Sequence, residues 1–142
     1  MLSGKITDEI FNSILPTYQL ERAYDWYSSH GSPDEQVQIL IYLGRSYFAD
    51  GDYDKAMSIY TNALDIAEKN KLNNLTGYTY SYIGDLYREK AMRTEAIKKY
   101  EMAADNFKKE NNTDSYACAL RDMGREYACT DSISRALEIL LM

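Results

Sequence analysis

The chain has 142 residues, of which 45% are hydrophobic and 27% are charged, and its formal net charge is −6. A chain of this size and composition is expected to fold into one domain with a continuous core rather than to stay disordered. The acidic balance argues against a nucleic-acid-binding surface, because neutralising phosphates requires an excess of Lys and Arg.

A short leading hairpin is predicted over residues 6–31. Its first helix begins at Thr7 and ends near Leu15. Its second helix opens at Pro16, carries apolar residues at helical spacing and ends at Gly31. The sequence has no run of about 18 apolar residues, so no membrane-spanning helix is predicted.

Helix-start and helix-stop signals divide the rest of the chain into paired helices. Ser32 and Glu35 flank Pro33 in the pattern of a capping box with proline in the first turn. Gly51 can adopt the left-handed conformation that ends a helix, and Asp52 can cap the next helix. The equivalent turn of the following pair reads Ala-Met-Arg and has no glycine. We predict helices over residues 33–49, 53–70, 75–90, 93–110 and 114–129, then a turn at 130–132 and a last helix from 133.

A set of residues recurs every 40 positions along these paired helices. Each set has a large apolar residue directly before a glycine, a tyrosine three positions after the glycine and an alanine twelve positions after it. The members are Leu43, Gly44, Tyr47 and Ala56, then Ile83, Gly84, Tyr87 and Ala96, and then Met123, Gly124, Tyr127 and Ala136. A fixed period of this length is typical of stacked helical units, each of which needs a neighbour to bury its apolar face.

The first two repeats extend this pattern. An aromatic residue follows the alanine by four positions, at Tyr60 and Tyr100, and a further alanine follows three positions later, at Ala63 and Ala103. The combined pattern, over about residues 37–142, resembles the tetratricopeptide repeat. This family usually has a period of about 34 residues, so the units resemble the extended repeats of bacterial peptide-sensing regulators and of cargo-binding or polarity scaffolds.

The resemblance implies an all-α fold, a right-handed α-solenoid built from antiparallel helix hairpins. We interpret the chain as a single repeat domain with a degenerate leading hairpin and three repeats, the last of them truncated. The corresponding ranges are 1–142 for the domain, 6–31 for the leading hairpin, and 33–72, 73–112 and 113–142 for the repeats.

One stripe on each first helix stays apolar or small in all three repeats, with Leu40, Tyr80 and Leu120 at equivalent positions, so we expect it to pack. A second stripe on each first helix changes in character from repeat to repeat. The resemblance places this stripe in the concave groove that the first helices of such arrays line. Arginine and aromatic side chains are common anchors of peptide interfaces, so we expect the stripe to bind a protein or peptide. Its residues are Gln38, Ile41, Arg45 and Phe48, then Tyr78, Ser81, Asp85 and Arg88, and then Cys118, Arg121 and Arg125.

An internal role for some of these charges is the main alternative. Arg45, Asp85 and Arg125 occupy equivalent positions one repeat apart and could form an ion ladder that holds the repeats together. The lysines and asparagines with which chaperone-binding members of the family clamp a peptide carboxylate are absent. Ile41, Arg45, Tyr82, Cys118 and Asp122 stand at the matching positions.

No catalytic, cofactor-binding or metal-binding residues are predicted. The one histidine, His30, lies at a predicted helix end, where it can complement the helix dipole. Cys118 and Cys129 are too far apart on one predicted helix to form a disulfide, and free thiols favour a cytoplasmic location.

We therefore expect a non-enzymatic protein-interaction scaffold that holds a peptide segment in its groove. The alternative is the sensor domain of a longer bacterial signalling or transcriptional regulator that binds a small peptide. The expected partners are proteins or peptides, with no direct contact to nucleic acid or membrane. Because the sequence stops at Met142 in the middle of the repeat pattern, we expect either a piece of a longer repeat protein or self-association through the uncapped last helix.

Overall fold

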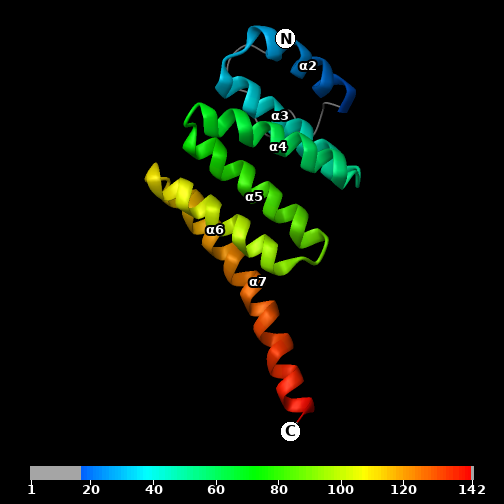
Figure 1. The fold of residues 1–142 in the computed structure, drawn as a ribbon, viewed down its shortest axis with the longest axis vertical. Coiled ribbons are helices and arrows are strands. Elements are labelled where there is room, and N and C mark those ends of the chain that lie inside the picture. The colour runs from blue at the N-terminus through cyan, green and yellow to red at the C-terminus, as the bar shows by residue number, and fades with distance from the viewer. Residues whose placement is uncertain (1–16, 142) are drawn as a thin grey trace.

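The computed structural model describes residues 17–141, except for the side chains of residues 131–136. The described helices are α2 (Thr17–His30), α3 (Pro33–Ala49), α4 (Tyr53–Lys69), α5 (Asn73–Glu89), α6 (Arg93–Lys109) and α7 (Thr113–Leu140). They stack in chain order along the long axis of the molecule, each against the next (Figure 1). This arrangement confirms the predicted all-α solenoid.

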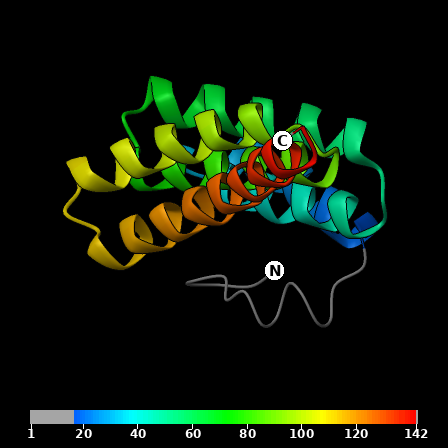
Figure 2. The ribbon, with the colours of Figure 1, turned by 90° about the horizontal axis from the view of Figure 1, so that it is seen from below.

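The helices pair into hairpins through short turns. The α3–α4 and α5–α6 pairs make the most extensive contacts, and α7 then packs against α6, as the view from below shows (Figure 2). Four of the described residues take the left-handed conformation that ends a helix and reverses the chain. They recur every 20 positions, at Gly51, Lys71, Ala91 and Asn111. The predicted turn without a glycine is therefore confirmed, with Ala91 at a φ of 59°.

The predicted capping box at Ser32 and the predicted cap at Asp52 are also confirmed, whereas the helix predicted from residue 75 begins at Asn73. The Ser32 hydroxyl accepts a hydrogen bond from the Glu35 backbone N–H at 3.2 Å, and the Glu35 carboxylate accepts one from the Ser32 N–H at 3.0 Å. The Asp52 carboxylate caps α4 by accepting from the Lys55 N–H at 3.2 Å. Helix α2 begins directly after Pro16 and ends directly before Gly31, as predicted. The predicted helix between Thr7 and Leu15 lies outside the described residues.

The recurring glycines let an aromatic ring sit between the two helices of a hairpin. A Cβ atom on Gly84 would lie 2.7 Å from Cε1 of Tyr100, and a Cβ on Gly44 would meet the Tyr60 ring in the same way. Both rings are fully buried, as are the recurring alanines of α4 and α6. The recurring glycine, aromatic residue and alanines of the sequence are therefore the residues that let the two helices pack closely in the α3–α4 and α5–α6 hairpins.

The third repeat does not close into a hairpin, so the predicted turn at residues 130–132 is wrong. Helix α7 runs without interruption from Thr113 to Leu140, and its second half projects beyond the stack (Figure 1). The Thr130 hydroxyl bonds to the Glu126 carbonyl at 3.0 Å, a contact within one continuous helix. Position 131, which matches Gly51 and Ala91, is an aspartate that stays helical here.

The straight course of α7 also corrects the expectation that the recurring apolar stripe packs in all three repeats. Leu40 and Tyr80 are 0% and 7% exposed, whereas the equivalent Leu120 is 44% exposed. No second helix covers this face of α7 within the described part of the chain. None of the helices α2–α7 is both long enough and apolar enough to cross a lipid bilayer.

Candidate functional site

Two adjacent hollows lie on the face formed by α3 and α5, each with a volume of about 310 Å³. Arg45 and Tyr82 border both hollows, so together they form one trough, which we call the α3–α5 trough. The first hollow is lined by Gln38, Ile41, Tyr42, Arg45, Leu75, Tyr78 and Tyr82, and the second by Arg45, Phe48, Ala49, Tyr60, Tyr82 and Asp85.

Arg45 stands at the junction of the two hollows, among aromatic rings. Its guanidinium carbon lies 5.8 Å from the centre of the Tyr42 ring and 5.2 Å from that of Tyr82. The Tyr82 ring stacks on Tyr60 with 5.9 Å between ring centres. Cation–π contacts of this kind hold the positive charge of an arginine close to the faces of aromatic rings. The trough therefore combines apolar walls with a positively charged group at its middle.

Tyr78 closes one end of the trough and links three helices. Its ring packs edge-on against Phe107 of α6, with ring centres 4.9 Å apart, and its hydroxyl lies 2.8 Å from the Ser115 hydroxyl of α7. The close approach of Phe107 requires Gly77, because a Cβ there would lie 2.6 Å from the ring. Even with these contacts Tyr78 stays exposed, with 38% of its surface accessible to solvent.

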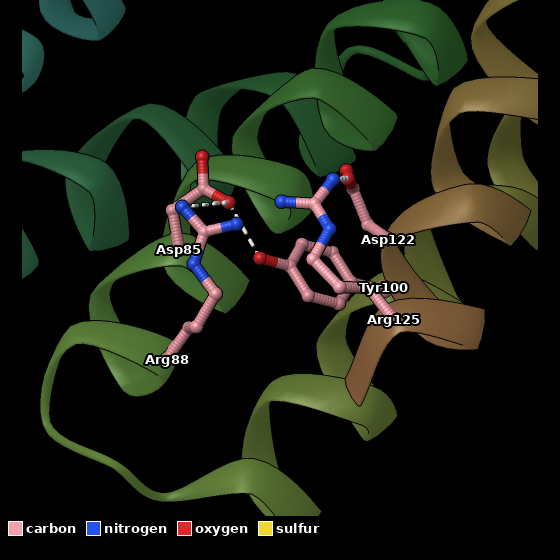
Figure 3. A network of polar contacts seen from close by, with 5 residues as sticks. All are labelled: Asp85, Arg88, Tyr100, Asp122 and Arg125. Carbon is pink, nitrogen blue, oxygen red and sulfur yellow. Dashed lines mark hydrogen bonds and ion pairs between the residues drawn. The ribbon is translucent and has the colours of Figure 1, made fainter. Parts of the chain in front are cut away.

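Asp85 lies at the other end of the trough, in a polar network with α6 and α7 (Figure 3). The Tyr100 hydroxyl donates a hydrogen bond to its carboxylate at 2.5 Å, and the Arg88 guanidinium lies 3.8 Å away. Burial raises the pKa of Asp85 above its ordinary value, although Tyr100 and Arg88 act in the opposite direction. Burial also raises the pKa of Tyr100, so its phenol remains a donor.

Six of the eleven predicted groove residues come together in the trough: Gln38, Ile41, Arg45, Phe48, Tyr78 and Asp85. The other five, Ser81, Arg88, Cys118, Arg121 and Arg125, do not line these two hollows.

Two of the three charges predicted as an ion ladder, Asp85 and Arg125, form local pairs. Asp85 pairs with Arg88, and Arg125 pairs with Asp122 at 2.8 Å, each within its own helix. Arg125 is still close enough to lower the pKa of Asp85. The Tyr100 hydroxyl bonds to Asp85 within the second repeat, whereas Arg125 of the third repeat acts on Asp85 from across the boundary between repeats.

Tyr42, Leu75 and Tyr82 are trough residues that we did not predict as site residues. Tyr42 and Tyr82 occupy the same position in successive repeats, and the third repeat has Asp122 there. A search restricted to positions that vary between the first two repeats passes over such a pair. The change from tyrosine to aspartate in the third repeat is the signal that could have identified it.

Comparisons with known proteins agree with this architecture. The family model described as "Tetratricopeptide repeat" matches residues 35–109. The chain is also similar to the curated protein "Photosystem I assembly protein Ycf3" of Rippkaea orientalis, with 29% identity over 91 residues. That match covers 63% of this chain and 52% of the relative, so the chain spans about half the length of the relative. With a family match over more than half of its residues, the chain belongs to the tetratricopeptide repeat family.

Proposed function

We propose that the chain is a non-enzymatic scaffold that binds a segment of another protein in the α3–α5 trough. The observation that carries this proposal is the pair of adjoining hollows that share Arg45 and Tyr82. Each hollow is large enough for a side chain, and because the two hollows adjoin, one bound segment can place a side chain in each. Aromatic and arginine side chains are the residue types that most often carry the energy of such interfaces.

The chemistry of the trough defines the segment that would fit best. Ile41 and Leu75 offer an apolar surface for an aliphatic or aromatic anchor in the first hollow. The Arg45 guanidinium suits a carboxylate or a backbone carbonyl of the ligand, and Asp85 suits a donor in the second hollow. Because the chain as a whole is acidic, a partner with a neutral or basic surface would meet less electrostatic repulsion.

Two further considerations support a scaffold role. Membership of the tetratricopeptide repeat family favours protein partners over small substrates. The curated relative is named as an assembly protein, and holding a segment of another protein is the kind of contact that assembly requires. We therefore infer that this chain positions a partner and does not transform it.

The test is capture of partners from a native lysate by the immobilised chain, followed by titration of the peptide segments identified. Arg45→Gln removes the charge at the centre of the trough and should weaken binding at least tenfold. Lys69→Gln removes one positive charge from an exposed site on α4 and should leave binding unchanged. Equal binding by wild type and Arg45→Gln would show that the trough is not the site. Loss of binding only in Arg121→Glu with Arg125→Glu would move the site to α7.

A further inference from the structure

Among the described residues, no side chain covers the face of α7 that carries Gly124, whereas its counterparts in the first two hairpins are covered. In the first two hairpins the equivalent glycines, Gly44 and Gly84, lie under tyrosine rings. A Cβ on Gly124 would meet no described atom within 4 Å. Leu120 and Tyr127, on the same side of the helix, are 44% and 49% exposed. The surface around Gly124, whose equivalents hold a tyrosine ring of the covering helix in the first two hairpins, is therefore exposed to solvent.

The second half of α7 resembles in sequence the helices α4 and α6, which cover the glycines of the first two hairpins. Ala136 stands where the covering helices have Ala56 and Ala96, and Leu140 stands where they have Tyr60 and Tyr100. In the structure the end of the helix is exposed and apolar, with Leu140 79% exposed, and Leu137, Ile139 and Leu141 are also exposed. One helix thus holds both halves of a hairpin, end to end.

These two halves cannot meet within one straight helix. Gly124 and Leu140 are 16 positions apart, which is about 24 Å at about 1.5 Å per residue. Helix α7 is held to the stack as far as Glu126, whose buried carboxylate pairs with Arg93 of α6 at 3.0 Å. Beyond that pair it leaves the stack, as Figure 1 shows. The covering half is therefore presented away from the body of its own chain.

A second copy of the chain can supply the cover with the same contacts that close the first two hairpins. Gly44 meets Tyr60, and Gly84 meets Tyr100, across turns centred on Asp52 and Met92. Two antiparallel α7 helices that place Gly124 of each copy against Leu140 of the other are centred in the same way on Ser132. The arrangement is reciprocal, so a two-fold axis closes it and each copy covers the other.

We propose that α7 is an opened hairpin through which two copies of this chain form a two-fold, swapped dimer. Residues 137–141 of each copy lie over Gly124 and Tyr127 of the other. The interface buries two apolar surfaces that are exposed in the single chain. Exposed apolar patches on a folded protein usually mark sites of interaction with another molecule. The α3–α5 trough lies on other helices, so a test of this proposal does not depend on whether the proposed function is correct.

The mass of the full chain in solution is the first test. We expect light scattering to give twice the 16.4 kDa of one chain. Leu140→Glu should reduce the mass to that of one chain. Met102→Glu, which changes an exposed apolar residue on α6, should leave the dimer intact. A wild-type chain with the mass of a single copy would overturn the proposal, as would a dimer that Leu140→Glu leaves intact.

Thiol cross-linking tests the register. In a background with Cys118→Ser and Cys129→Ser, a Gly124→Cys copy and a Leu140→Cys copy are refolded together and treated with a short bis-maleimide. We expect a covalent dimer from the mixture and none from either variant alone, because identical positions lie far apart in the antiparallel pair. No covalent dimer from the mixture would overturn the proposed register. A cross-link within single chains of a Gly124→Cys, Leu140→Cys double variant, with none in the mixture, would show a closed hairpin instead.

A third test uses matched variants at position 131, where the helix has to break for the hairpin to close; we call this position the hinge. Asp131→Gly places glycine where Gly51 stands in the first repeat, and it should increase the fraction of single chains by favouring a closed hairpin. Asp131→Ala favours continued helix and should leave the dimer fraction as high as in the wild type or higher. An unchanged fraction of single chains in Asp131→Gly would contradict the hinge.

Discussion

Gly84→Ala tests whether the recurring glycine exists to admit the tyrosine ring of its own hairpin. The added Cβ would lie 2.7 Å from Cε1 and 2.9 Å from Cδ1 of Tyr100. That ring is fully buried and its hydroxyl is fixed by Asp85, so it cannot move aside freely. The substitution therefore forces α5 and α6 apart or tilts the ring.

Two opposing effects set the size of the change. Overpacking of a buried site costs about 1–3 kcal/mol, while alanine in place of glycine inside a helix contributes about 1 kcal/mol of stability. We expect the difference to lower the free energy of unfolding by about 1 kcal/mol. The measurement is urea unfolding followed by far-ultraviolet circular dichroism, with the midpoint and slope compared between variants.

A Tyr100→Leu background separates the two effects. Leucine lacks the ring atoms Cε1 and Cζ, so the same Gly84→Ala change should there become neutral or stabilising. The coupling free energy between the two sites should be about 1–3 kcal/mol. If Gly84→Ala destabilises the Tyr100→Leu chain as much as the wild type, close packing of the ring is not the reason for the glycine.

Three further predictions concern the turns, a buried ion pair and a buried acid. Ala91→Gly should raise the free energy of unfolding by about 1 kcal/mol and Gly51→Ala should lower it by a similar amount, because both positions have positive φ. The same urea titrations check this prediction, and changes of the same sign in the two variants would refute it. Arg93→Ala should destabilise by about 3 kcal/mol, because it leaves the carboxylate of Glu126, 1% exposed, without its partner; Glu126→Gln in the same chain should recover part of the loss. Burial raises the pKa of Asp85 in the folded chain, which keeps its proton at a pH where the unfolded chain has lost it. The free energy of unfolding of wild type, relative to Asp85→Asn, should therefore rise as pH falls through the range just above 3.8; a difference that does not change with pH would contradict this.

Local signals in the sequence predict much of the fold because they act within a few residues. The capping box at Ser32 and the cap at Asp52 use backbone donors of the helices that they begin, so sequence spacing alone identifies them. The glycine, tyrosine and alanine pattern specifies contacts between two helices, and it recurs often enough to reveal the hairpin. At Ala91 the preference of the residue for a helix is overridden, because the packing of α5 against α6 requires the chain to reverse there.

The trough was harder to predict because its residues belong to two kinds of position. Arg45 and Asp85 vary between repeats and were found on that criterion. Tyr42 and Tyr82 are the same in both repeats, yet they line the trough. Each also packs against buried residues, Tyr42 against a cluster of α2 and α3 and Tyr82 against a cluster of α4 and α5. A residue can thus pack against its own repeat with one side of its ring and face a ligand with the other.

The course of α7 depends on a balance that no local pattern in the sequence could resolve. A closed hairpin and a swapped dimer bury the same apolar pairs, so packing alone does not choose between them. The closed form requires a residue near position 131 to take the left-handed conformation, which costs a residue other than glycine about 1–2 kcal/mol. The straight form keeps its helical hydrogen bonds through the hinge, but dimerisation costs translational and rotational freedom. The helical hinge between Glu126 and Leu137 therefore links the conformation of one residue to the number of chains in the assembly.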